Sequence, residues 1–211
     1  MLYFAGATGA IHVAGNAQWK IGPDGKDNWI GRAVYACVSS GSGDLTDEQE
    51  KANAQYIYNY LAARGFTKQA ICGVLGNMEQ ESGLNPGAWE VKNNIGHGYG
   101  LVQWTDAGTK ILDWANLNYD QANEMASNDP KKLMDLNLEY LVIKMQPGGK
   151  EWYPTREYNS PYKMTYDEYI QSDKDAGDLA KVFHAHIERS GDDDSGIERR
   201  ASNARKWYNI L

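Results

Sequence analysis

Two glutamates near the end of one predicted helix are the first candidates for acid–base chemistry. Glu79 and Glu81 lie in the stretch GNMEQESGLNPGAW. The apolar side chains of this helix recur at helical spacing: Ile71, Val74, Leu75 and Met78. At about 100° per residue, each glutamate lies about 80° from the centre of the apolar face, on opposite flanks. Partial burial raises the pKa of a carboxyl, which suits a general acid. Spacing alone does not choose between the two glutamates, and a solvated helix end is the alternative.

A glycine-rich loop with aromatic side chains follows this helix. It reads GHGYGLVQW at residues 96–104. Glycine lets the backbone approach a ligand closely. Tyr99 and Trp104 offer flat faces to sugar rings, and Gln103 offers both a donor and an acceptor. The same composition also fits a tight turn packed on a core.

The elements that position these residues are mostly helices. Thr46 and Gln49 form a capping-box pattern that opens a helix ending near Gly65. The helix with the two glutamates follows Thr67 and ends at Gly83. A third helix is expected around 111–115, opened by Thr105 or Thr109. The remaining predicted helices run from Asp129-Pro130 to about 147, over about 165–189 with a break near 173–177, and over about 196–210. Residues 150–164 are expected to form a loop.

The first 44 residues differ from the rest in composition. Gly22-Pro23-Asp24-Gly25 is a turn signal between short stretches with Trp19, Ile21, Trp29 and Ile30, which predicts a hairpin or an irregular β segment. Residues 39–43 read SSGSG, a flexible linker by composition. We therefore expect an N-terminal extension over 1–44 and a helical domain over 45–211. A loop within one domain is the alternative.

Composition excludes several classes of function. The 211 residues carry 21 Lys and Arg against 28 Asp and Glu, a net charge of −7, and form no basic stripe for nucleic acid. No apolar run is long enough for a membrane span, and the N-terminus lacks the pattern of a signal peptide. Cys37 and Cys72 are expected to be buried thiols, with a single disulfide as the alternative. The four histidines show no metal-ligand spacing, so neither a metal nor a cofactor is expected.

Together the glutamate and the loop resemble the lysozyme superfamily. Goose-type lysozymes and lytic transglycosylases share the layout of Glu-Ser at a helix end, then Gly and Pro, then Gly-Leu-(apolar)-Gln about twenty residues later. The longer segment ANAQYIYNYLAARGFTKQAICGVLGNMEQESGLNPGAWE is similar to the phage tail lysozyme family. This family comprises peptidoglycan-cutting domains on the tail tips of phages that infect Gram-positive bacteria. The downstream segments MTYDEYIQS and FHAHIERSG also resemble it, so the likeness covers about residues 46–210.

The resemblance implies roles for particular residues. Glu81 occupies the position of the catalytic acid, and Ser82 follows it as in the family. The loop that lines the sugar cleft corresponds to Gly100, Leu101, Val102, Gln103 and Trp104, next to Tyr99. Glu79 matches no functional position.

A Glu-Arg pair near the end of the family's long C-terminal helix corresponds to Glu188-Arg189. We expect Glu188 at the base of the cleft, pairing across it and counted among the substrate-binding residues, with a direct role in catalysis as the alternative. The family usually has an aromatic residue before this glutamate, whereas Ile187 stands here.

The implied fold is a mostly α, lysozyme-like domain, and the implied reaction is cleavage of peptidoglycan between N-acetylmuramic acid and N-acetylglucosamine. A second carboxylate stays open, with Glu90, Asp106 and Asp113 as candidates by proximity in sequence. Without one, the chain would be a lytic transglycosylase. A glucosaminidase and a catalytically silent wall-binding or tail module are further alternatives. The expected partners are peptidoglycan and other virion proteins, in a phage tail or outside the cell at the bacterial wall, with no nucleic acid and no membrane.

Overall fold

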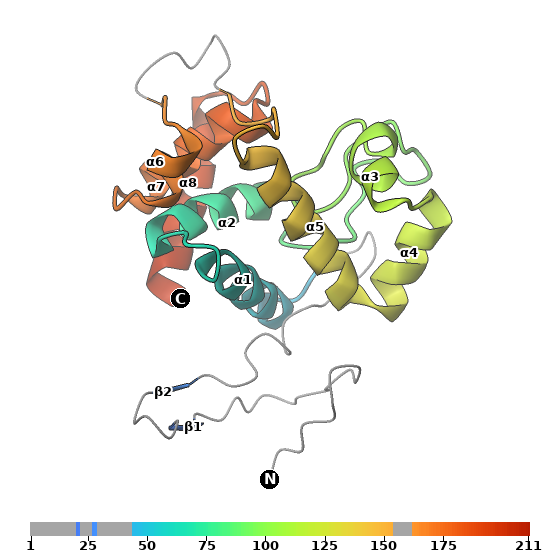
Figure 1. Ribbon diagram of the computed structural model, residues 1–211, viewed down its shortest axis with the longest axis horizontal. Helices are drawn as coiled ribbons and strands as arrows, with labels where there is room; N and C mark the ends of the chain where they lie inside the picture. The colour runs from blue at the N-terminus through green and yellow to red at the C-terminus, as the bar shows by residue number, and fades with distance from the viewer. Residues whose placement is uncertain (1–19, 22–26, 29–43, 154–161) are drawn as a thin grey trace.

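The computed structural model describes residues 20–21, 27–28, 44–153 and 162–211, and the part it describes is mostly helical (Figure 1). Helix α2 (Lys68–Ser82) lies at the centre. Helices α6 (Tyr166–Ile170), α7 (Ala176–Phe183) and α8 (Asp194–Ile210) gather on one side of it. The segment with α3 (Asp113–Ala115) and α4 (Tyr119–Asn128) lies on the other side, beyond α5 (Pro130–Met145). This arrangement is a mostly helical domain, as the sequence predicts.

The two N-terminal helices begin and end where the sequence predicts. Helix α1 (Asp47–Ala62) has the expected capping box, in which Thr46 and Gln49 bind each other's backbone amides. The Thr67 side chain caps α2, and Gly83 ends it in the left-handed conformation, with φ of +58°. A side chain with a Cβ disfavours this φ, which explains the glycine.

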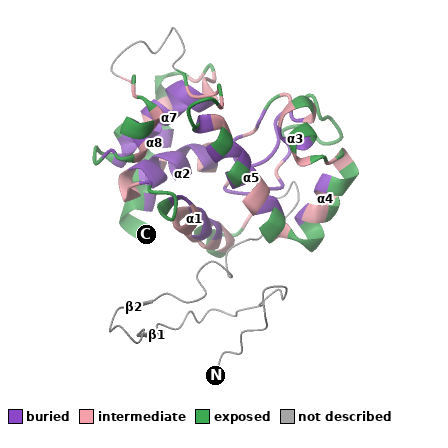
Figure 2. Ribbon diagram, in the orientation of Figure 1, coloured by how far each residue is buried: buried purple, intermediate pink, exposed green. Residues whose placement is uncertain are grey.

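Helix α2 is buried over more of its surface than the apolar face that the sequence predicts. Every residue from Ala70 to Met78 is buried, as the purple of Figure 2 indicates, because α2 packs against α1, α7 and α8 together. Two glycines permit the closest approaches. A Cβ on Gly76 would lie 2.4 Å from the Arg200 carbonyl oxygen on α8, and one on Gly73 would lie 2.9 Å from the Leu179 carbonyl carbon on α7.

The middle of the chain departs from the prediction in two places. The third helix begins as a π-helical turn, η2 (Gly108–Leu112), and continues as α3 (Asp113–Ala115). Its N-cap is Ala107, without a side-chain cap, so the expected capping by Thr105 or Thr109 is wrong. Helix α4 (Tyr119–Asn128) was not predicted, although Asn118 and Gln121 form a capping box at its start.

The C-terminal half follows the predicted order. Helix α5 (Pro130–Met145) starts after the N-cap Asp129 as expected. The break predicted near 173–177 separates α6 (Tyr166–Ile170) from α7 (Ala176–Phe183). A π-helical turn, η4 (His184–Glu188), extends α7, and α8 (Asp194–Ile210) ends the chain.

The N-terminal segment contains the β element that its turn signal predicts. Strands β1 (Lys20–Ile21) and β2 (Asp27–Asn28) pair antiparallel, with Lys20 opposite Asn28. The turn between them, the linker over 39–43 and Cys37 lie outside the described residues. The domain boundary near residue 44 therefore stays a prediction.

The sequence predicts a buried thiol at Cys72 and no membrane-spanning segment. Cys72 is a free, buried thiol, and burial raises its pKa to about 12. Across the described ranges, none of the helices is long and apolar enough to cross a membrane.

We predict that Gly76→Ala destabilises the domain although alanine favours a helix. Helix propensity would add about 0.5–1 kcal/mol of stability. The new Cβ would collide with backbone atoms of α8, and such overpacking costs about 1–3 kcal/mol. Urea unfolding should show a net loss of stability. The control Gly191→Ala meets no atom within 4 Å and should stay within about 0.5 kcal/mol of the parent chain. Equal stability of Gly76→Ala and the parent would refute the close contact.

Candidate active site

A cavity of about 450 Å³ lies where the end of α2 and the loop that follows it meet the distant segment around Glu188. It is lined by Glu81, Ala88, Trp89, Glu90, Gln103, Thr105, Glu188 and Ser190. Three of these residues are glutamates, and each comes from a different segment: the end of α2, the following loop and the end of η4. Of the predicted site residues, the cavity brings Glu81, Gln103 and Glu188 together.

Glu81 is held by an ion pair in a mostly buried position. Its Oε1 atom accepts a hydrogen bond from the Arg200 guanidinium at 2.6 Å, and its side chain is 18% exposed. Burial raises the pKa of Glu81 and is the largest influence, while Arg200 lowers it and Asp192 and Glu90 raise it further. The net direction is upward, because the loss of hydration outweighs the ion pair.

Arg200, which contacts Glu81, was not identified by the sequence analysis. It lies on α8 with its side chain only 3% exposed. Besides Glu81, its guanidinium donates to Asp192 Oδ2 at 2.8 Å, to Asn77 Oδ1 at 3.3 Å and to Ser190 Oγ at 3.4 Å. The contact with Glu81 spans 119 positions of sequence, so no local pattern could reveal it.

Glu188 lies in the cavity without the pairing that was expected of it. Its Oε1 atom is buried and has no hydrogen-bond partner. The neighbouring Arg189 points its guanidinium elsewhere, toward Glu151 Oε2 at 2.8 Å. Burial and the nearby Glu81 hold the pKa of Glu188 well above its usual range, although Arg200 and Arg189 oppose the shift.

Gln103 contributes an acceptor to the cavity. Its Nε2 atom donates to the carbonyls of Ala88 at 3.2 Å and Gly100 at 2.8 Å. Its Oε1 atom is buried without a partner. The side chain therefore both fixes the loop and leaves one oxygen for a donor in the cavity, so its replacement would affect folding as well as binding.

The aromatic side chain in the cavity is not one of those predicted. Tyr99 and Trp104 are buried and do not line the cavity, so the expectation that they face the sugar is corrected. Tyr99 lies behind Trp89, with ring centroids 4.0 Å apart, and Trp89 lines the cavity in its place. Trp104 packs edge-on against Tyr140.

Ser82, Gly100 and Leu101 do not line the cavity. They hold together the segments whose other residues line it. The Ser82 hydroxyl donates to the Leu101 carbonyl at 3.0 Å, which ties the end of α2 to the loop. Gly100 has φ of +83°, and a Cβ there would lie 2.0 Å from Asn137 Oδ1. The amide of the buried Leu101 donates to that same oxygen at 3.0 Å. Gly100 therefore makes room for Asn137 of α5 and not for a ligand.

Of the three candidates for a second carboxylate, only Glu90 lines the cavity. Its side chain is 52% exposed, and its Oε2 atom accepts from the Gly98 amide at 2.8 Å. Asp106 instead accepts from the Gly108 amide at 3.1 Å, and Asp113 is an exposed residue at the start of α3.

The remaining titratable groups near α2 and η4 have structural partners. Glu79 lies outside the cavity lining and binds Lys206 and the Trp207 indole on α8. His184 and His186 are both buried: His184 lies 2.8 Å from Ser190 Oγ, and His186 bonds the Val182 carbonyl. Among the described residues, no cluster of His, Cys, Asp or Glu could hold a metal ion.

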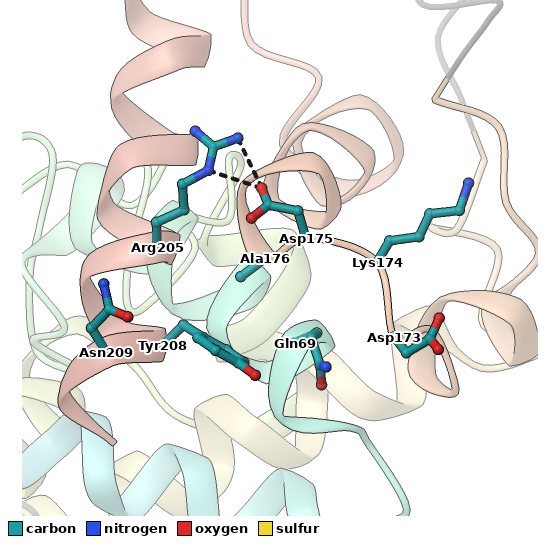
Figure 3. Close-up of a pocket in the computed structure, with 8 residues that line it drawn as sticks. All are labelled: Gln69, Asp173, Lys174, Asp175, Ala176, Arg205, Tyr208 and Asn209. Carbon is teal, nitrogen blue, oxygen red and sulfur yellow. Dashed lines mark hydrogen bonds and ion pairs between the residues drawn. The ribbon is translucent and has the colours of Figure 1, made fainter.

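A second hollow of about 340 Å³ lies near the C-terminal end of α8 (Figure 3). It is lined by Gln69, Asp173, Lys174, Asp175, Ala176, Arg205, Tyr208 and Asn209. Arg205 and Asp175 form an exposed ion pair there, with 2.8 Å between the Arg205 Nη2 and Asp175 Oδ1 atoms. None of the predicted site residues lines this hollow, so the cavity with Glu81 is the candidate active site.

Comparison with known proteins identifies relatives over the same part of the chain. The sequence profile of the phage tail lysozyme family matches residues 52–211, which include the whole lining of the cavity. Morphogenesis protein 1 of Bacillus phage B103 is 37% identical over 169 residues, covering 79% of this chain. The chain spans about two fifths (41%) of the length of that relative.

We predict that Arg200→Met destabilises the domain far more than Arg205→Met, a change on the same helix. Removing the cation from a buried pair leaves Glu81 and Asp192 uncompensated, at a cost of about 3–5 kcal/mol at neutral pH. The exposed pair of Arg205 should contribute about 1 kcal/mol or less.

The pH dependence provides a second readout for the same pair of variants. Carboxylates left without Arg200 bind protons more tightly in the folded than in the unfolded chain, so stability falls as pH rises. Urea unfolding should therefore show a smaller deficit for Arg200→Met near pH 4 than at pH 7. Equal, pH-independent deficits for the two arginine variants would contradict the network.

Proposed function

Because the chain belongs to the phage tail lysozyme family, we propose that it cleaves the glycan strand of peptidoglycan with Glu81 as the general acid. The bond is the β-1,4 link between N-acetylmuramic acid and N-acetylglucosamine. The observation that carries this proposal is the position of Glu81: a mostly buried carboxyl with a raised pKa that lines a cavity of about 450 Å³. Such a group keeps a transferable proton at higher pH than a free glutamate does.

The chemistry follows from the contacts of Glu81. Its carboxyl protonates the glycosidic oxygen while an oxocarbenium-like transition state develops on the sugar. Proton transfer leaves a carboxylate in a poorly hydrated site. The Arg200 guanidinium, 2.6 Å from Oε1, stabilises that carboxylate and fixes the side chain for the reaction. Arg200 thus favours proton release, and burial opposes it.

We propose that the reaction is a hydrolysis, in which water attacks the sugar after the glycosidic bond is protonated. Glu90 is the further carboxylate of the cavity that is open to solvent, and it suits the role of a base that activates water. In a lytic transglycosylase the sugar's own 6-hydroxyl would replace water, and Glu90 would have no such part. The products distinguish the two reactions.

We also propose that the chain acts as part of a phage virion. The relative from Bacillus phage B103 is named a morphogenesis protein, which supports association with other virion proteins. Residues 1–44, the predicted N-terminal extension, precede the family match and would provide a docking segment for them. The proposed place of action is the bacterial cell wall, with peptidoglycan as substrate.

We predict that Glu81→Gln abolishes wall cleavage without unfolding the chain. Glutamine keeps the shape and can still accept from Arg200, but it has no transferable proton. General acid catalysis is usually worth about 10²–10⁴-fold, so the rate should fall by at least this order. The measurement is mass spectrometry of digested peptidoglycan, where reducing muramic acid ends indicate hydrolysis and anhydro-muramic ends indicate transglycosylation.

Glu79→Gln is the matched control, two positions earlier on the same helix. Its carboxylate binds Lys206 and Trp207 outside the cavity, so its activity per folded molecule should match the parent. Wild-type activity should also fall as pH rises through the raised pKa of Glu81, because the acid is then ionised. A Glu81→Gln variant near full activity would refute the assignment. A wild-type chain that releases no new glycan ends would refute the enzyme and leave a wall-binding module.

A further inference from the structure

We propose that Glu188 is a neutral hydrogen-bond donor that holds the bound glycan by one of its oxygen atoms. This inference rests on the proposed function, since it concerns the same cavity. It starts from the buried Oε1 atom of Glu188, which has no partner within the chain although the residue lines the cavity. Buried polar atoms are nearly always paired, so an unpaired one on a residue that lines a cavity points to a ligand.

The cations near Glu188 are committed to other acceptors. Arg200 contacts Glu81 at 2.6 Å and Asp192 at 2.8 Å. Arg189 donates to the Glu151 carboxylate at 2.8 Å and to backbone carbonyls of Glu151 and His186. Three carboxyls, those of Glu81, Asp192 and Glu188, therefore surround one buried guanidinium, and it binds the first two.

The charged groups that face Glu188 favour its neutral form. Burial is the largest influence, and Glu81 and Asp192 raise its pKa further. Arg200 and Arg189 lower the pKa without reversing the shift, so it stands well above the ordinary range. A protonated carboxyl offers an O–H donor, which a carboxylate lacks.

As a hydrogen-bond donor, Glu188 has a different role in the cavity from that of Glu81. Arg200 touches Glu81, so that carboxyl can lose its proton to the substrate and be stabilised as an anion. Glu188 has no such contact, so its proton stays in place and is shared with an acceptor. Hydroxyl and carbonyl oxygens of the sugars are acceptors of this kind. Glu188 is thus a substrate-binding residue and not the base of the reaction.

The test compares two variants of Glu188 in the full chain. Glutamine keeps a donor of nearly the same size, so Glu188→Gln should retain kcat/KM on peptidoglycan within about threefold. Leucine fills the space without a donor, so Glu188→Leu should lose about tenfold, which is the range of one neutral hydrogen bond. Glu198→Gln, at an exposed residue on α8 outside the cavity, is the control for a glutamate-to-glutamine change that does not alter the cavity lining.

A stability measurement checks the protonation state without reference to turnover. A glutamate with a raised pKa binds its proton more tightly in the folded chain, so stability falls as pH rises above the ordinary pKa. As pH rises above that value, the unfolding free energy of Glu188→Gln and Glu188→Leu should therefore fall less than that of the parent and of Glu198→Gln. An unchanged slope would overturn the neutral state of Glu188.

Activity outcomes separate this inference from the proposed function. If the parent cleaves peptidoglycan but Glu188→Gln is as inactive as Glu81→Gln, Glu188 acts as an anion or transfers a proton, and the inference is wrong. Full activity of both Glu188→Gln and Glu188→Leu would also overturn it, because no substrate contact would then exist. A parent chain that releases no new glycan ends refutes the proposed function itself.

Discussion

The ion pair between Arg200 and Glu81 is the interaction on which the rest of the site depends. It joins α8 to the end of α2, and the same guanidinium also binds Asp192, Asn77 and Ser190. The pair forms because α2 and α8 approach closely at Gly76, where a Cβ would collide with the Arg200 carbonyl. One buried cation therefore contacts the end of α2 and the segment after η4, and it sets the charge balance beside the cavity.

The single cation also makes two glutamates in one cavity unequal. Both have raised pKa values, and burial is the main cause for each. Only Glu81 contacts Arg200, so its anion is the one that the protein can stabilise after a proton leaves. Two carboxyls whose surroundings separate their proton affinities are the usual basis for assigning different roles in acid catalysis. The proposed division, a proton donor at Glu81 and a hydrogen-bond donor at Glu188, follows from this difference.

Local signals in the sequence predict most of the helices, and capping residues locate α1, α2 and α5. Spacing does not separate Glu81 from Glu79, and only the family resemblance carried by Glu-Ser selects Glu81. The same signals cannot show which side of a loop faces the cavity, so Tyr99 and Trp104 were placed on the surface that Trp89 occupies. Gly100 was expected to approach a ligand, whereas it makes room for Asn137 of α5. Arg200 could not be found because its contact with Glu81 is set by the packing of distant helices.

The central claim is that burial outweighs the ion pair, so that Glu81 keeps its proton to higher pH than a free glutamate. A ¹³C NMR titration of the glutamate carboxyls in the full chain tests it, with resonances assigned from Glu81→Gln and Glu188→Gln. We predict that both carboxyls titrate above the ordinary value of about 4.3, with Glu188 above Glu81. Titration of Glu81 at or below the ordinary value would mean that Arg200 keeps it ionised, and would contradict its role as the general acid.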